Sequence, residues 1–115
     1  EKGLREEVCV GNLEATRDFI DVRDAAKAYA VAVNYGVPGQ TYILASGKEH
    51  SIKEVLDTLI SFAKTKIRVV TDPALLRPSD TPRMRGVPTN EPWWEPEILF
   101  EKSLEDLLNY WREKI

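Results

Sequence analysis

The chain has 115 residues, of which 43% are apolar, enough for a modest core and for one domain or part of one. Its net charge of −3 is typical of a soluble protein and argues against a nucleic-acid-binding protein, which usually carries a basic surplus. No apolar run is long enough to span a membrane and the first residues lack a signal pattern, so we expect a cytoplasmic protein with no membrane partner.

The first half of the chain is predicted to contain a strand, a helix and a second strand. Residues 6–10 are a short strand candidate, and Asp21 can cap a helix over residues 22–35, with Asp24 completing an acidic capping box. Residues 40–46 (QTYILAS) are rich in aromatic and β-branched residues and predict a strand that is buried on both faces. Helical spacing predicts a buried stripe composed of Val22, Ala25, Ala26, Tyr29, Ala30 and Val33.

The second half is predicted to contain two more helices, a strand and a long loop. Ser51 and Glu54 form a capping box for the first helix, and residues 66–72 form the strand. Six of the seven prolines lie between residues 72 and 96, so this stretch is too proline-rich for a regular element. A last helix begins near Leu99. The two apolar stripes are Ile52, Val55, Leu56, Leu59, Ile60 and Ala63, then Leu104, Leu107, Leu108, Trp111 and Ile115.

Helices and strands alternate, as is typical of α/β proteins. Three strands and three helices are few, however, and a strand buried on both faces needs neighbours that these elements do not supply. We therefore interpret residues 1–115 as one unit and as a fragment of a longer chain. An uncovered strand would favour self-association of the fragment.

Two motifs resemble catalytic elements but lack the required context. The sequence Gly-Val-Pro-Gly at residues 36–39 leads from helix to strand, whereas a dinucleotide-binding loop leads from strand to helix. Tyr110 and Lys114 have the Tyr-x-x-x-Lys spacing that places a phenol and an ammonium on one helical face. No cofactor fold precedes them, so we expect Tyr110 to pack and Lys114 to be a surface charge.

Cysteine and histidine are also poor candidates for chemistry. Cys9 is the only cysteine and His50 the only histidine, too few for a disulfide or a zinc cluster. No acid is placed to orient His50 toward Ser46 or Ser51, so a nucleophile is not supported. We predict no metal and no catalytic residue within these 115 residues.

Two arginines and an acid point to anion binding. Arg17 lies on a turn before the helix at 22–35, and Arg77 lies in LLRPSD, followed by Asp80. Arginine presents a planar fork of five donors that suits phosphate oxygens, and the acid could reach a sugar hydroxyl. Such a set would match a diphosphate next to a ribose. The alternative is that each arginine makes only a weak surface ion pair.

Four segments resemble successive motifs from the C-terminal part of extended short-chain dehydrogenases that act on nucleotide sugars. They are VGNLEATRDFIDVRDAAKAY, SGKEHSIKEVLD, LLRPSDTPRM and WWEPEILFEKSLEDLLNYWR. The closest resemblance is to GDP-mannose 4,6-dehydratases and GDP-4-keto-6-deoxymannose reductases, with details that favour the reductases. The implied fold class is α/β, namely the C-terminal substrate-binding portion of a Rossmann-type enzyme whose Rossmann half is absent.

The resemblance implies roles for five residues. Arg17 and Arg77 would contact the substrate diphosphate, Asp80 the ribose hydroxyls, and Asn12 and Leu13 would lie near the nucleotide. The substrate would be a nucleotide sugar, with a GDP-sugar favoured, and the parent enzyme a homo-oligomer. NADP or NAD would be bound by the absent Rossmann half, which also supplies the catalytic Tyr-x-x-x-Lys. The fragment alone would therefore bind no cofactor and be inactive.

Two alternatives stay open. One is an epimerase or dehydratase of the same superfamily that acts on UDP- or dTDP-sugars. The other is a non-catalytic nucleotide-binding or interaction module that has lost the Rossmann half. The segment MRGVPTNEPWWEPEI is shorter than in the family and has Val87 where an acid is common, so the edge of the nucleotide pocket is expected to differ from that of the family.

Overall fold

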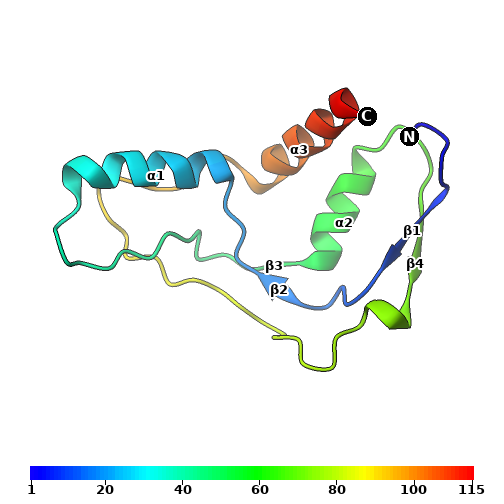
Figure 1. Cartoon of the computed structure of the whole chain (residues 1–115), viewed down its shortest axis with the longest axis horizontal. Coiled ribbons are helices and arrows are strands. Elements are labelled where there is room, and N and C mark those ends of the chain that lie inside the picture. The colour runs from blue at the N-terminus through cyan, green and yellow to red at the C-terminus, as the bar shows by residue number, and fades with distance from the viewer.

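The computed structural model describes all of residues 1–115 as an open arrangement of three α-helices and four short strands (Figure 1). The helices are α1 (Val22–Tyr35), α2 (Ile52–Ser61) and α3 (Phe100–Lys114). Helix α1 lies at one end of the molecule, whereas α2 and α3 contact each other toward the other end, where both chain termini lie. The molecule measures 50 × 36 × 18 Å, so it is elongated and thin.

Two pairs of strands join segments that are distant in the sequence. Strand β1 (Glu7–Val10) runs parallel to β4 (Arg68–Thr71). Strand β2 (Thr16–Arg17) runs antiparallel to β3 (His50–Ser51). The first and third of the expected strands are therefore confirmed as β1 and β4, each shorter than predicted, whereas the β2–β3 pair was not expected.

A third extended segment joins the β2–β3 pair. Thr16 forms an isolated parallel bridge with Arg83. In this bridge the backbone N–H of Thr16 donates to the carbonyl of Pro82 at 2.9 Å, and Met84 N–H donates to the carbonyl of Thr16 at 3.1 Å. We call β2, β3 and residues 82–84 the central ribbon, because the candidate site is built around it.

Helices α1 and α2 begin at the predicted capping residues. The carboxylate of Asp21 accepts a hydrogen bond from Arg23 N–H at 2.8 Å. Ser51 and Glu54 form the expected reciprocal capping box at the start of α2. The acidic capping box expected at α1 does not form, because the carboxylate of Asp24 bonds to the backbone of a distant loop instead.

The apolar stripe that was predicted to be the buried face of α1 is exposed. Val22, Tyr29 and Val33 are 78%, 70% and 85% exposed, while Asp24 and Ala28 are the buried residues of the helix. The helix itself is therefore confirmed, but its packing face was predicted wrongly. Periodicity identifies an apolar face, and it does not show whether an element to cover that face is present.

Asp24 explains which face of α1 is buried. Its Oδ2 accepts hydrogen bonds from the backbone N–H groups of Glu97 at 3.0 Å and Ile98 at 2.9 Å. The indole N–H of Trp94 donates to the carbonyl of Asp24 at 2.9 Å. Buried polar groups must find partners, and these three bonds hold the polar side of α1 against the loop before α3.

Residues 40–46 do not form the predicted strand. A strand needs a ladder of backbone hydrogen bonds with a neighbour. Residues 41–46 make one backbone–backbone hydrogen bond, from Thr89 N–H to the carbonyl of Ile43 at 3.4 Å. Burial on both faces was also wrong, because Ile43 is exposed and Ala45 is buried.

Helices α2 and α3 cover each other only in part. The stripe of α2 is half-buried against α3, but on α3 only Leu104 is buried, while Leu107, Trp111 and Ile115 of the predicted stripe are exposed. The radius of gyration is 17.2 Å, against about 13 Å for a compact domain of this length. These residues by themselves therefore enclose little core.

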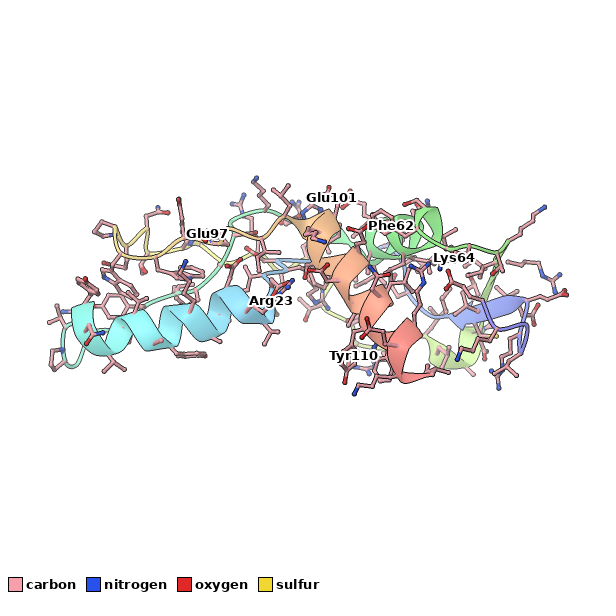
Figure 2. The ribbon with its side chains drawn as sticks, turned by 90° about the horizontal axis from the view of Figure 1, so that it is seen from above. Arg23, Phe62, Lys64, Glu97, Glu101 and Tyr110 are labelled. Atoms are coloured by element: carbon pink, nitrogen blue, oxygen red, sulfur yellow. The ribbon has the colours of Figure 1, made fainter.

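Arg23 joins the start of α1 to the middle of α3, and Phe100 holds the start of α3 against the central ribbon. The guanidinium of Arg23 donates to Asp21 at 2.8 Å and to Asp106 at 2.9 Å, and Figure 2 shows it at the end of α1 that faces α3. The bonds from Arg23 hold the pKa of the buried Asp21 carboxyl far below its usual range. The ring of Phe100 stacks on that of His50, with 3.8 Å between centroids.

The long loop after β4 contains one 3-10 turn (Pro73–Leu75) and no further helix or named strand before α3, so the proline-rich loop is confirmed. It returns from β4 beneath the molecule to α1 and then to α3 (Figure 1). No helix of the chain has both the length and the apolar character needed to cross a membrane.

Candidate functional site

The turn that carries Arg17 is fixed by the residue after it. The carboxylate of Asp18 accepts hydrogen bonds from the N–H of Ser46 at 3.0 Å, the hydroxyl of Ser46 at 2.7 Å and the N–H of Gly47 at 2.9 Å. These three bonds join the end of β2 to the extended segment at 41–46. The position of the Arg17 backbone is therefore set by polar contacts rather than by a large core.

A close backbone approach completes this anchoring. A Cβ atom added at Gly86 would lie 2.3 Å from the Cβ of Ala45, too close for any side chain, and 3.6 Å from a carboxylate oxygen of Asp18. Gly86 lies two residues after the central ribbon. Glycine is required there because the loop passes against the segment that Asp18 holds.

Arg17 is oriented by the loop that crosses beside it. Its Nη1 donates to the carbonyls of Thr81 at 2.8 Å and Thr16 at 2.7 Å, and its Nη2 lies 3.2 Å from Oδ1 of Asp80. The side chains of Arg17 and Asp80 are 28% and 29% exposed, so the pair can still be reached from solvent. A pair so placed adds at most about 1 kcal/mol to stability, and its main effect is to fix the guanidinium plane.

Asn12 completes a three-residue cluster. Its Nδ2 donates to Oδ2 of Asp80 at 3.2 Å, while its Oδ1 accepts from Glu14 N–H at 2.9 Å. Asp80 therefore bridges Arg17 and Asn12 through its two oxygens. We call Asn12, Arg17 and Asp80 the polar cluster. It places a guanidinium, a carboxamide and a carboxylate side by side on the surface.

The two other predicted site residues lie outside the polar cluster. Arg77 is exposed and makes no hydrogen bond or ion pair, although it lies three residues before Asp80 on the same loop. The side chain of Leu13 is half-buried, and its carbonyl accepts from Lys53 N–H at 3.0 Å. The structure thus brings together three of the five predicted residues, and the ligand roles of all five remain predictions.

A second ion pair, which was not predicted, lies on the central ribbon. Nε and Nη2 of Arg83 donate to the carboxylate of Glu49 at 2.9–3.2 Å, and the hydroxyl of Thr16 donates to the same carboxylate at 3.2 Å. Arg83 is the main cause of a lowered pKa at Glu49. Thirty-four positions separate Glu49 and Arg83, so no local spacing pattern could have revealed the pair.

The residues that the sequence analysis rejected as catalytic candidates make contacts outside the polar cluster. His50 is stacked on Phe100 and its Nδ1 lies 3.1 Å from the carboxylate of Glu54, so its ring is held between α2 and α3. The expectation that no acid orients this histidine was therefore wrong. Tyr110 is half-exposed on α3 (Figure 2), with Lys114 Nζ 5.6 Å from its ring centroid. No group of three or more His, Cys, Asp or Glu side chains is arranged to hold a metal ion.

Two surface hollows lie at a different place from the polar cluster. One of about 220 Å³ and one of about 480 Å³ flank residues 90–95, and both are lined by Glu91 and Glu95 together with Trp93. Neither contains a residue of the polar cluster. We place the candidate anion site at the cluster, because two carboxylates in the hollows would repel an anion whereas Arg17 attracts one.

Comparison with known proteins gives consistent matches over this chain. Residues 1–107 match the family described as GDP-mannose 4,6 dehydratase. The chain is 33% identical over 109 residues to the GDP-6-deoxy-D-mannose reductase of Pseudomonas aeruginosa, covering 92% of this chain and 36% of that protein. The structure of RMD from Pseudomonas aeruginosa complexed with NADPH superposes with a TM-score of 0.89 at 30% identity, over 99% of this chain and 39% of that chain.

More distant solved structures share the fold. A putative epimerase from Burkholderia cenocepacia has a TM-score of 0.83 at 28% identity, over 94% of this chain and 37% of that one. UDP-glucose 4-epimerase from Thermus thermophilus, complexed with NAD, has a TM-score of 0.80 at 24% identity, over 95% and 36%. At 24% identity the likeness shows the fold alone.

These matches confirm the expected fold class. The chain has the α/β architecture of the C-terminal portion of an extended short-chain dehydrogenase/reductase, and it spans little more than a third of the length of the relatives it matches. Within this class the chain belongs to the GDP-mannose 4,6 dehydratase family.

Proposed function

We propose that residues 1–115 are the substrate-binding portion of an NAD(P)-dependent enzyme that modifies a GDP-sugar, either as a GDP-mannose 4,6-dehydratase or as a GDP-4-keto-6-deoxymannose reductase. The polar cluster is the observation that carries this proposal, because Arg17 and Asp80 are 3.2 Å apart and accessible. The family membership and the similarity to a GDP-6-deoxy-D-mannose reductase support the choice of substrate class.

The cluster has the chemistry that a nucleoside diphosphate requires. The guanidinium of Arg17 has donors left over after its bonds to Asp80 and two carbonyls, and these can bond phosphate oxygens. The carboxylate of Asp80 can accept from ribose hydroxyls, and Asn12 lies on its other side. Arg77, which is exposed and makes no hydrogen bond or ion pair, can add a second guanidinium to the diphosphate.

The uncovered surfaces support action within a longer polypeptide. The apolar face of α1 is exposed, residues 41–46 have an almost unpaired backbone, and the matched relatives are nearly three times as long as this chain. None of the 115 residues forms a glycine-rich phosphate loop after a strand, so the residues here do not fit a dinucleotide. When bound elsewhere in the enzyme, the nicotinamide would supply hydride transfer, and this chain would hold the nucleotide end of the substrate.

Activity assays on the complete native polypeptide test the proposal. Incubation with GDP-mannose and NADP⁺ should yield the 4-keto-6-deoxy sugar if the enzyme is a dehydratase. If it does not, GDP-4-keto-6-deoxymannose with NADPH should be reduced. If neither reaction occurs and a UDP- or dTDP-sugar is turned over, the enzyme is an epimerase or dehydratase that acts on a sugar nucleotide with another base.

The exposed face of α1 favours a second candidate, a binding or interaction module without turnover. Such a module would bind a nucleotide or a partner chain through the uncovered surfaces. Isothermal titration with GDP and analytical ultracentrifugation distinguish it from the enzyme. Nucleotide binding by a polypeptide that turns over none of the sugars above would support the module.

A further inference from the structure

The part of the loop that carries Arg77 and Asp80 is attached to the rest of the molecule at the central ribbon. After Asp72, whose N–H donates to the carbonyl of Val10 at 2.9 Å, the next backbone hydrogen bonds from this loop to another element are those of the Thr16 bridge, at 2.9 and 3.1 Å. The next contact along the loop, from Thr89 to Ile43, is longer at 3.4 Å. The position of the arginine and the acid therefore depends on what secures residues 82–84.

Glu49 secures this point from one side of the ribbon. Thr16, at the centre of the bridge, donates to Glu49 through its hydroxyl, and Arg83, its bridge partner, donates three times to the same carboxylate. The side chain of Glu49 is 21% exposed, whereas that of Arg83 is 75% exposed. The Glu49 carboxylate is thus the more buried member of the pair, and Arg83 lies on its solvent side.

The short distance along the chain makes this attachment effective. Five residues separate Arg77 from Arg83, and two of them, Pro78 and Pro82, have a fixed φ. Asp80 lies midway. A stretch so short and so restricted transmits a displacement at Arg83 to Asp80, and through Asp80 to the guanidinium of Arg17.

We infer that Glu49 and Arg83 form a positioning pair that holds the Arg77–Asp80 stretch against β2 in the conformation that receives the nucleotide diphosphate. This inference rests on the proposed function. Neither residue belongs to the polar cluster, and their effect on the ligand is exerted through Asp80 and Arg17. The pair acts on binding, because the reacting sugar carbon lies beyond the diphosphate.

The test uses the complete native polypeptide and measures the Kd for GDP by titration together with KM and kcat for the sugar substrate. Glu49→Gln keeps the shape of the side chain and removes its charge, and Arg83→Lys keeps the charge and removes the fork. Each is expected to raise Kd and KM by about tenfold, as for one lost charge-assisted bond, with kcat changed less than twofold. Glu101→Gln, an exposed carboxylate on α3 without an ion pair, is the matched control and should change nothing.

The exchanged pair separates positioning from a general loss of structure. Glu49→Arg combined with Arg83→Glu restores an ion pair at the same place and should recover most of the lost affinity. Single variants that bind GDP as the wild type does would overturn the inference while the proposed function stands. A wild-type polypeptide that binds no GDP while it is folded would remove the proposed function, and this inference with it. Because Arg83 is exposed, Arg83→Lys should unfold at the wild-type temperature and keeps the test valid if Glu49→Gln is unstable.

Discussion

The central ribbon and helix α1 differ in how many of their polar and apolar groups find partners within these 115 residues. Around the ribbon, Asp18, Asp80 and Glu49 each have two or more partners within the 115 residues, drawn from segments far apart in sequence. On α1 the polar side is equally well satisfied through Asp24, but the apolar side is open to solvent. The buried polar side-chain atoms of this chain therefore all have partners, while much of its apolar surface is uncovered. A site of paired polar side chains can thus form in a chain that leaves much of its apolar surface exposed.

The largest effect should come from the polar side of α1. Asp24→Ala removes a buried carboxylate that accepts from two part-buried backbone N–H groups, and we expect the free energy of unfolding of the native polypeptide to fall by about 2–4 kcal/mol. Chemical denaturation measures this loss. The control is Asp57→Ala, which removes only a surface pair with Lys53 and should change stability by less than about 0.5 kcal/mol. Equal losses in the two variants would contradict the importance given to Asp24.

The next effect concerns the ribbon and its ligand. Arg17→Ala should weaken binding of a GDP-sugar by about 1.5–3 kcal/mol, because a charge-assisted contact to the diphosphate is lost, and Arg77→Ala should act alike. Titration calorimetry on the native polypeptide gives the affinities. Arg5→Ala, an exposed arginine without an ion pair, serves as control. Unchanged affinity in both Arg17→Ala and Arg77→Ala would reject the diphosphate assignment.

A smaller effect tests whether the open face of α1 is covered in the native polypeptide. Val33→Ser should lower the free energy of unfolding there by about 1–2 kcal/mol, since a covered valine contributes roughly that much. The neighbouring exposed Asn34→Ser is the control. In residues 1–115 expressed alone, Val33→Ser should instead reduce self-association in sedimentation experiments. An unchanged free energy of unfolding of the native polypeptide with Val33→Ser would show that this face is exposed to solvent there as well.

The smallest effect is a dependence of stability on pH at the start of α1. Bonds from Arg23 lower the pKa of Asp21 in the folded state, so the ionised carboxylate stabilises the fold above its unfolded pKa of about 3.9. This contribution is lost as the pH falls through the lowered folded pKa. The difference in unfolding free energy between wild type and Asp21→Asn should therefore be constant near neutral pH and shrink below about pH 4. A difference that stays constant down to about pH 2 would contradict the role of the charge.

Local signals in the sequence located the three helices and two of the strands, but not the surroundings of these elements. Ser51 and Asp21 predicted two helix starts correctly, because capping depends on a few adjacent residues. The apolar character of residues 40–46 and of one face of α1 was also real. Whether a strand forms or a face is buried depends, however, on neighbours that spacing cannot reveal.

The same limit applies to the candidate site. Arg17, Asp80 and Asn12 were expected at one site because of a family resemblance, and the structure places their side chains in contact. The Glu49–Arg83 pair was not predicted, because the sequence around either residue contains no signal that the two are in contact. Long-range pairs of ordinary surface residues leave no periodic or motif-like trace in a single sequence.

The parallel pairing of β1 with β4 has a consequence for the order of folding. Glu7 lies opposite Arg68, so sixty residues must be enclosed before this ladder can form, and the Arg17–Asp80 contact spans a similar length. Contacts of such long range form slowly, whereas the capped helix α2 needs only its own turns. The polar cluster should thus appear among the last contacts of the folding chain. A nucleotide that binds there would bind only molecules that have completed these contacts, and it would raise their unfolding temperature by an amount set by its concentration and its Kd.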